Sequence, residues 1–203
     1  MSDTIKLNEK QKDALKEIGT IGAGHAAMAL SQMIGEKVNI AVVKVEILPS
    51  DEFNQIVGGP DTLGAAIYIQ MLGDFKGGIF LFFKRTQALH LIDILLHKKK
   101  GETIMLSEMG MSALKEAGNI LSGSYLSSMS QMVPFKIALS VPRFAFDMIG
   151  YVVEGIFGEI MQTENKCLSL VTEFIESTNQ IKGYFVFLPK KETMERILKE
   201  VDV

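Results

Sequence analysis

The chain repeats part of itself at an offset of 99 residues. Two short blocks recur without gaps, and two glycines recur between them in the same register. The matching pairs are Ala14–Glu17 with Ala113–Glu116, Gly19 with Gly118, Gly24 with Gly123, and Ser31–Met33 with Ser130–Met132. Chance rarely produces ungapped identities in two blocks at one register, so the sequence predicts an internal duplication.

Both halves of the chain show the same order of expected elements, a long helix, a strand and a hairpin. The first half is expected to hold a helix over 8–34, started by the capping-box pattern Asn8–Gln11, a strand over 38–48, strands over 62–71 and 77–83, and a short helix over 86–96. The second half is expected to hold a helix over 107–132, strands over 135–141, 168–174 and 182–188, and a helix over 190–201. Residues 146–157 fit a helix or a strand equally well.

These elements predict an α+β fold in one domain over residues 1–203. The domain is expected to consist of two pseudo-repeats, about 8–97 and 104–203, related by a pseudo-two-fold axis. Each half would pack its long helix on an antiparallel sheet of about three strands. A chain of 203 residues with 47% hydrophobic residues can bury the core that such a domain requires.

Charge and hydropathy narrow the class of protein. The apolar runs are far shorter than the roughly 20 residues that span a bilayer, and residues 1–6 lack the apolar core of a signal peptide, so we expect a cytoplasmic protein. A net charge of −3 without an extended basic cluster argues against a nucleic-acid partner. Cys167 is the single cysteine, and we expect a buried structural thiol there.

One face of the second long helix carries the candidate site. Ser112, Glu116 and Asn119 fall within about 60° of one another at 100° per residue. The stripe continues through the small residues Gly123, Ser127 and Ser130. The side chains along such a face are either simply solvated or positioned so that the surface of another protein can approach the helix backbone.

The pattern Ser112-x3-Glu116-x2-Asn119-x22-Pro142 resembles the signature of the CheC, CheX and FliY family of chemotaxis phosphatases. Members of this family remove the phosphoryl group from the aspartate of the response regulator CheY. The resemblance extends over nearly the whole chain, because the duplicated helices, the glycine-rich turn after the first motif and the length also match. It implies catalytic roles for Glu116 and Asn119, supporting roles for Ser112 and Pro142, and two partners, a phosphorylated CheY-like regulator and a CheD-like receptor deamidase.

The chemistry of an aspartyl phosphate agrees with these roles. It is a high-energy acyl phosphate whose Mg²⁺ the regulator supplies, so hydrolysis mainly requires a water held in line with the phosphorus. The carboxamide of Asn119 can accept a hydrogen bond from that water and orient it. Glu116 can pair with a lysine of the regulator as an anchor, and Pro142 would end its strand and shape the site. We expect no metal or cofactor of the chain's own.

The first half carries a degenerate copy, Asp13-x3-Glu17-x2-Thr20, with Val43 in the place of Pro142. The threonine hydroxyl lies closer to the backbone than an asparagine amide and reaches less far. We therefore expect this half to be weak or inactive in hydrolysis. It would dock a regulator through Glu17 or serve only in folding, and the sequence leaves both open.

Other interpretations remain for parts of the chain. The segment 22–27 resembles a dinucleotide-binding turn, but a helical pattern precedes it, so close helix packing is the preferred interpretation. The methionines, Met28, Met105, Met109 and Met129 among them, fit an adaptable binding surface or core filling, and core filling is preferred. The alternative function is a non-catalytic adaptor for CheD or for the regulator.

Overall fold

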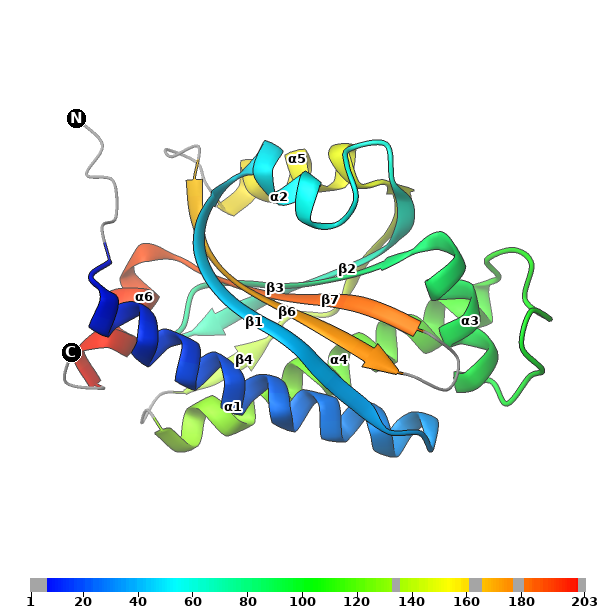
Figure 1. Ribbon diagram of the computed structural model, residues 1–203, viewed down its shortest axis with the longest axis horizontal. Helices are drawn as coiled ribbons and strands as arrows, with labels where there is room; N and C mark the ends of the chain where they lie inside the picture. Colours follow the sequence, from blue (N-terminus) through cyan, green and yellow to red (C-terminus); the bar gives the residue numbers. More distant parts are fainter. Residues whose placement is uncertain (1–6, 133–135, 161–165, 177–180, 201–203) are drawn as a thin grey trace.

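In the computed structural model, which describes residues 7–132, 136–160, 166–176 and 181–200, helices cover both faces of one sheet (Figure 1). The long helices α1 (Glu9–Ile34) and α4 (Glu108–Met132) lie on one face, and α2 (Ser50–Ile56) and α5 (Ile149–Ile160) lie on the other. The helices α3 (Arg85–Leu95) and α6 (Lys191–Glu200) flank the long helices at opposite ends. The predicted α+β class is confirmed.

The described strands form a single seven-stranded antiparallel sheet. The strands are β1 (Val38–Pro49), β2 (Leu63–Gly73), β3 (Gly77–Lys84), β4 (Ile137–Leu139), β5 (Arg143–Met148), β6 (Lys166–Glu176) and β7 (Ile181–Pro189). Their order is β1-β6-β7-β3-β2-β4, and β5 also pairs with β2. The hairpins β2–β3 and β6–β7, both expected from the sequence, are joined at the centre by the pairing of β3 with β7.

The edge strands cross between the halves of the chain. β1, from the first half, pairs along its length with β6 of the second half, whereas β4 and β5 pair with β2 of the first half. The expected sheet of about three strands in each half is therefore replaced by one continuous sheet. The physical reason is that the outer strand of each hairpin has backbone groups to pair, and the edge strand of the opposite half supplies the partners.

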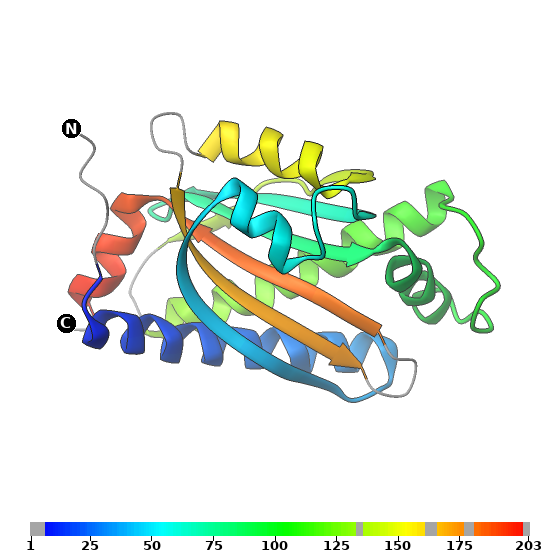
Figure 2. The same ribbon diagram turned by 45° about the horizontal axis from the view of Figure 1, so that its top comes forward.

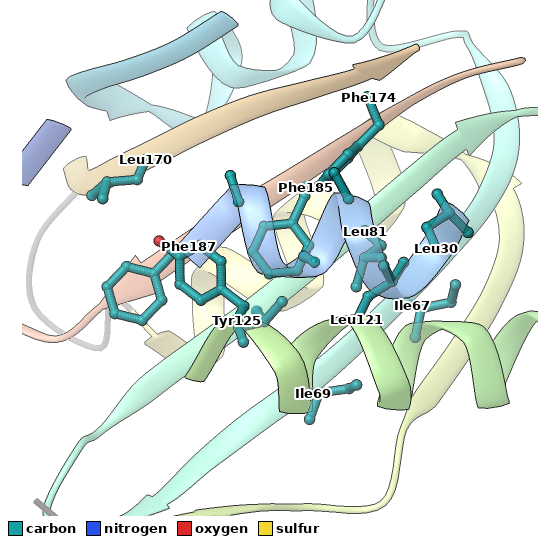
Figure 3. Packing of buried hydrophobic residues seen from close by; sticks show 14 of the residues in the cluster. Leu30, Ile67, Ile69, Leu81, Leu121, Tyr125, Leu170, Phe174, Phe185 and Phe187 are labelled. Carbon is teal, nitrogen blue, oxygen red and sulfur yellow. The ribbon is translucent and has the colours of Figure 1, made fainter. Parts of the chain in front are cut away.

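Alternation along the central strands divides the core between the two faces. In β3, Ile79, Leu81 and Phe83 point toward the long helices, whereas Phe80 and Phe82 point toward α2 and α5. The larger cluster surrounds Tyr125 of α4, whose ring centroid lies 4.7 Å from that of Phe185 and 5.5 Å from that of Phe187 (Figure 3).

Local predictions can be compared with the structure element by element. The capping box at Asn8 is confirmed, since its side chain accepts from the Gln11 backbone N–H at 2.9 Å and its backbone N–H donates to the Gln11 side chain. Helix α2 was not predicted and stands between the strands that were expected over 38–48 and 62–71. The ambiguous stretch 146–157 contains the end of β5 and then α5.

Two other expectations concern strands and the lone thiol. The strand expected over 135–141 is described only as β4 at 137–139, with residue 135 outside the described part. Cys167 lies in β6, but its side chain is outside the described part, so the expectation of a buried thiol is untested. Within the described ranges, no helix combines the length and apolar character needed to cross a bilayer.

Candidate functional site

Helix α4 presents Ser112, Glu116 and Asn119 to solvent, as its periodicity predicts. Its opposite side is buried through Leu114, Ala117, Leu121 and Tyr125, each no more than 2% exposed. Among the residues that the structure describes, the three polar side chains form no hydrogen bond or ion pair. The buried side holds the helix in place, so the exposed side is available to a partner.

Two glycines hold α4 close to its neighbours on either side of this face. A Cβ at Gly118 would lie 2.8 Å from a methyl carbon of Ile67 in β2, so the helix backbone beside Asn119 rests directly on the sheet. A Cβ at Gly110 would lie 3.0 Å from Ile92 of α3. Ser107 caps the same end, because its hydroxyl accepts from the Gly110 backbone N–H at 3.1 Å. These contacts hold α4 in a defined position against β2 and α3.

Pro142 lies in the edge of the sheet beneath this helix and not on the helix itself. It falls between β4, which ends at Leu139, and β5, which begins at Arg143, and α4 contacts both strands. At this break the backbone N–H of Gln70 in β2 donates to the Ser140 hydroxyl at 2.9 Å. The predicted interruption of the strand near Pro142 is therefore present, and the role of Pro142 in a site stays a prediction.

Helix α1 presents the degenerate residues in the same way. Asp13, Glu17 and Thr20 are all exposed. The Thr20 hydroxyl donates to the carbonyl oxygen of Lys16 at 2.7 Å, which holds it against its own helix. Val43, the counterpart of Pro142, lies in β1 paired with Thr172, and its side chain is outside the described part.

The two helices run side by side in opposite directions on the same face of the sheet (Figures 1 and 2). Where they meet, a Cβ at Gly22 would lie 2.6 Å from the Tyr125 ring. The interpretation of segment 22–27 as a close helix contact is therefore confirmed for Gly22. Gly24 and Gly123 instead have nothing within 4 Å of an added Cβ, so the backbone is accessible there on both helices.

The described residues contain no group of three or more histidine, cysteine or acidic side chains that could hold a metal ion. The methionines divide between core and surface. Met129 is 1% exposed, in agreement with core filling, whereas Met28, Met105 and Met109 are 59%, 70% and 66% exposed. Core filling is therefore wrong for these three residues. Helical periodicity could have indicated Met109, which lies on the same stripe as Glu116.

Comparison with solved structures shows that this fold is shared with FliY and with the FliM middle domain. The structure superposes on FliY of Thermotoga maritima with a TM-score of 0.77 and 22% identity, covering 98% of both chains. It superposes on the FliM middle domain of Helicobacter pylori with a TM-score of 0.69 and 15% identity, covering 96% of this chain and 99% of that one.

Sequence comparison identifies the family. The model of the CheC-like family matches residues 11–42 and 109–145. The chain is 32% identical over 195 residues to the CheY-P phosphatase CheC of Bacillus subtilis (strain 168), covering 94% of this chain and 93% of that protein. It is 33% identical over 138 residues to the flagellar motor switch phosphatase FliY of the same organism, of which it spans 36%. The chain belongs to the CheC-like family.

The two matched segments contain both candidate faces. Segment 11–42 includes Asp13, Glu17 and Thr20, and segment 109–145 includes the Ser112, Glu116, Asn119 and Pro142 pattern. Because α1 and α4 lie on the same side of the sheet, both faces open on one side of the molecule.

Proposed function

We propose that this protein is a phosphatase that hydrolyses the phospho-aspartate of a CheY-like response regulator. One observation carries the proposal: Glu116 and Asn119 stand exposed, one turn apart, on a rigidly packed helix within a segment matched by the CheC-like family. The 32% identity to a CheY-P phosphatase over most of the chain supports the same activity.

In the proposed mechanism, Asn119 acts on the attacking water. Its side-chain oxygen accepts a hydrogen bond from the water and aims a lone pair of the water at the phosphorus. The new phosphorus–oxygen bond forms as the bond to the aspartate oxygen breaks, so the products are inorganic phosphate and a free carboxylate. An amide positioned in this way accelerates hydrolysis by orienting the water, without itself exchanging a proton.

Glu116 acts as the anchor that sets the register of docking. A carboxylate one turn from Asn119 can form a charge-assisted hydrogen bond with a lysine beside the phosphorylated aspartate. Ser112 and Pro142 would shape the two ends of the contact. Mg²⁺ would come from the regulator and not from this chain. A solved complex of CheX with CheY, BeF₃ and Mg²⁺ from Borrelia burgdorferi shares the fold, with a TM-score of 0.55 and 17% identity over 85% of this chain and 96% of that one. It supports a CheY-like regulator as the partner.

We also infer that the domain, residues 1–203, arose by duplication of pseudo-repeats at about 8–97 and 104–203. The order helix, strand, helix, hairpin, helix occurs twice, if β4 and β5 are taken as one interrupted strand. The sheet order reads the same from either edge when each strand is exchanged for its counterpart. The edge strands are irregular at corresponding places, a register shift between Ile40 and Val42 and the break at 140–142.

The remaining partners follow from the family resemblance alone. A CheD-like receptor deamidase is proposed as a second partner, and a cytoplasmic location is the setting in which we expect the protein to act. The alternative function is an adaptor that binds CheD or the regulator without hydrolysis. The degenerate face of α1, where the Thr20 hydroxyl is held by its own helix, favours an adaptor role for that half.

The experiment that tests the proposal measures the decay of a phosphorylated CheY-like regulator with Mg²⁺ present, with and without CheD. The wild-type chain should accelerate decay, Asn119→Ala should abolish the acceleration, and Thr20→Ala should leave it intact. If the wild-type chain accelerates decay under none of these conditions, the phosphatase proposal is wrong and the adaptor is the better account.

A further inference from the structure

Three large apolar side chains stand in solvent just before the candidate site. Ile104 and Met105 precede α4 and are 74% and 70% exposed, and Met109 in its first turn is 66% exposed. We call these three residues the apolar patch. Ile104 and Met105 lie in the connection between α3 and α4, which projects from one end of the molecule (Figures 1 and 2). Exposed apolar side chains gathered in a short segment commonly mark an interaction site.

The connection that carries the patch is held in a defined shape. The carboxylate of Asp93, only 1% exposed, accepts hydrogen bonds from the backbone N–H groups of Gly101 at 2.7 Å and Thr103 at 2.8 Å. Arg85 donates to the carbonyl oxygen of Ile104 at 3.3 Å. Leu106 is partly buried and packs against the larger hydrophobic cluster. Anchors on both sides of Ile104 and Met105 keep these side chains outward, which lowers the entropic cost of binding through them.

The patch continues the face that carries Glu116 and Asn119. Met109 lies three residues before Ser112 and about 60° around the helix from it. It lies seven residues before Glu116, which is two turns or roughly 10 Å along the axis. A partner that covers Glu116 and Asn119 would therefore reach Met109 by extending two turns toward the start of α4.

We propose that the apolar patch binds an apolar area on the surface of the phosphorylated response regulator, beside the aspartate that Asn119 and Glu116 address. This inference rests on the proposed function and adds to it the residues that supply affinity. The occupant is the regulator because Met109 shares one helical face with Glu116 and Asn119, and Ile104 and Met105 stand in the connection that leads directly into that helix. A regulator seated for hydrolysis would therefore extend onto the patch. Methionine suits this use because its flexible thioether adapts to the partner's shape.

The first half of the chain offers a comparison. At an offset of 99 residues the counterpart of Met109 is Lys10, an exposed cation in the first turn of α1. A regulator would therefore lack this apolar contact on α1. Because of this difference between Met109 and Lys10, we expect the regulator to bind tightly to the α4 face and not to the α1 face.

The test compares the full-length wild type with the triple variant Ile104→Ser/Met105→Ser/Met109→Ser and with the single variant Met109→Ser. Met28→Ser is the matched control, because Met28 is an exposed methionine on α1 at 59%. The rate of decay is measured against the concentration of phosphorylated CheY-like regulator. Binding is measured by titration with the same regulator carrying beryllofluoride and Mg²⁺. Circular dichroism and the thermal midpoint report folding, and Met109→Ser serves if the triple variant does not fold.

The triple variant should raise both KM and the dissociation constant about tenfold or more, with kcat within about twofold of wild type. Met28→Ser should change none of these quantities. An unchanged KM and dissociation constant, in a series where Asn119→Ala still abolishes hydrolysis, would overturn the inference and leave the proposed function standing. If Asn119→Ala has no effect on decay, that result contradicts the proposed function itself, and the inference that rests on it falls as well. The patch could instead mediate self-association. That result would be a wild type that sediments as a dimer and a triple variant that sediments as a monomer, with KM unchanged, and it would also overturn the inference.

Discussion

Helices α1 and α4 bury the same positions and expose different chemistry. The matched buried residues are Leu15, Ile18, Gly19, Gly22, Ala23, Ala26, Ala27 and Leu30 in α1, and Leu114, Ala117, Gly118, Leu121, Ser122, Tyr125, Leu126 and Met129 in α4, each 99 residues apart. On the exposed side, Glu17 and Glu116 correspond, but Thr20 stands where α4 has Asn119. The buried pattern determines that both are helices on the sheet. The exposed residues differ, and the change at the proposed water-positioning residue, Thr20 against Asn119, is the one that bears most directly on hydrolysis.

The buried residues of the two helices also differ in size. Tyr125 occupies the position that corresponds to Ala26, and its ring fills the space left by Gly22. The large side chains of one helix are thus accommodated by the small residues of the other. Two copies of one pattern can therefore pack closely without being identical.

Among the substitutions that test the difference between α1 and α4, Asn119→Ala is expected to have the largest effect. Removing the amide that positions water should slow hydrolysis of the phosphorylated regulator by about one to two orders of magnitude or more. The readout is single-turnover decay of the phosphorylated regulator, and Thr20→Ala provides the matched control on α1. Equal losses from the two substitutions would show that the faces contribute alike.

The connection before α4 is expected to depend on Asp93. Asp93→Ala leaves the buried backbone N–H of Thr103 without an acceptor and also removes the acceptor of the Gly101 N–H, so it should reduce the free energy of unfolding by about 1–3 kcal/mol. Urea unfolding at neutral pH measures this loss, with Asp61→Ala as a control at an exposed position. A loss no larger than that of the control would contradict a structural role for this carboxylate.

Asp93 should also make stability depend on pH. Burial alone raises the pKa of Asp93, but hydrogen bonds from Thr103 and Gly101 outweigh it and the His90 charge adds to them, so the pKa lies below its ordinary value. A lowered folded-state pKa contributes stability above the unfolded value, about 3.9, and the contribution is lost as pH falls through the folded value. Unfolding measured between pH 6 and pH 3 should show a smaller pH dependence in Asp93→Asn than in wild type.

Alanine substitutions at two glycines of α1 test the contact between the two long helices. Gly22→Ala places a Cβ against the Tyr125 ring and should destabilise the protein by about 1–2 kcal/mol, because the overpacking exceeds the gain in helix propensity. Gly24→Ala meets open space and should be neutral or stabilising by up to about 1 kcal/mol. Thermal and urea unfolding of both variants provide the measurement. A stabilising Gly22→Ala would mean that the helices can separate without cost.

The smallest effect is expected from giving α1 the amide that it lacks. Thr20→Asn should raise the rate by at most about twofold, since a second site can at best equal the first and Val43 still replaces Pro142. In an Asn119→Ala background the same change should restore part of the lost activity. No recovery in the double variant would indicate that α1 needs more than the amide, and Val43→Pro is then the next substitution to measure.

Much of the fold could be predicted from local signals. The capping box at Asn8, the apolar stripe of α1 and the β2–β3 and β6–β7 hairpins were all expected because each depends on residues near one another in the chain. Helix α2 was missed because seven residues are too few for helical periodicity to stand out, and what holds it is burial of Phe53 against α5 and the sheet.

By itself, the sequence determined the two long helices, the repeat that relates them and the face that carries Ser112, Glu116 and Asn119, because periodicity and capping are properties of a few consecutive turns. Only the tertiary structure decided that each edge strand pairs with the opposite half, because strand pairing is made by backbone groups that are alike in every residue. It also decided that Met105, which lies outside any helix, faces solvent, since an apolar side chain becomes core only where another element covers it.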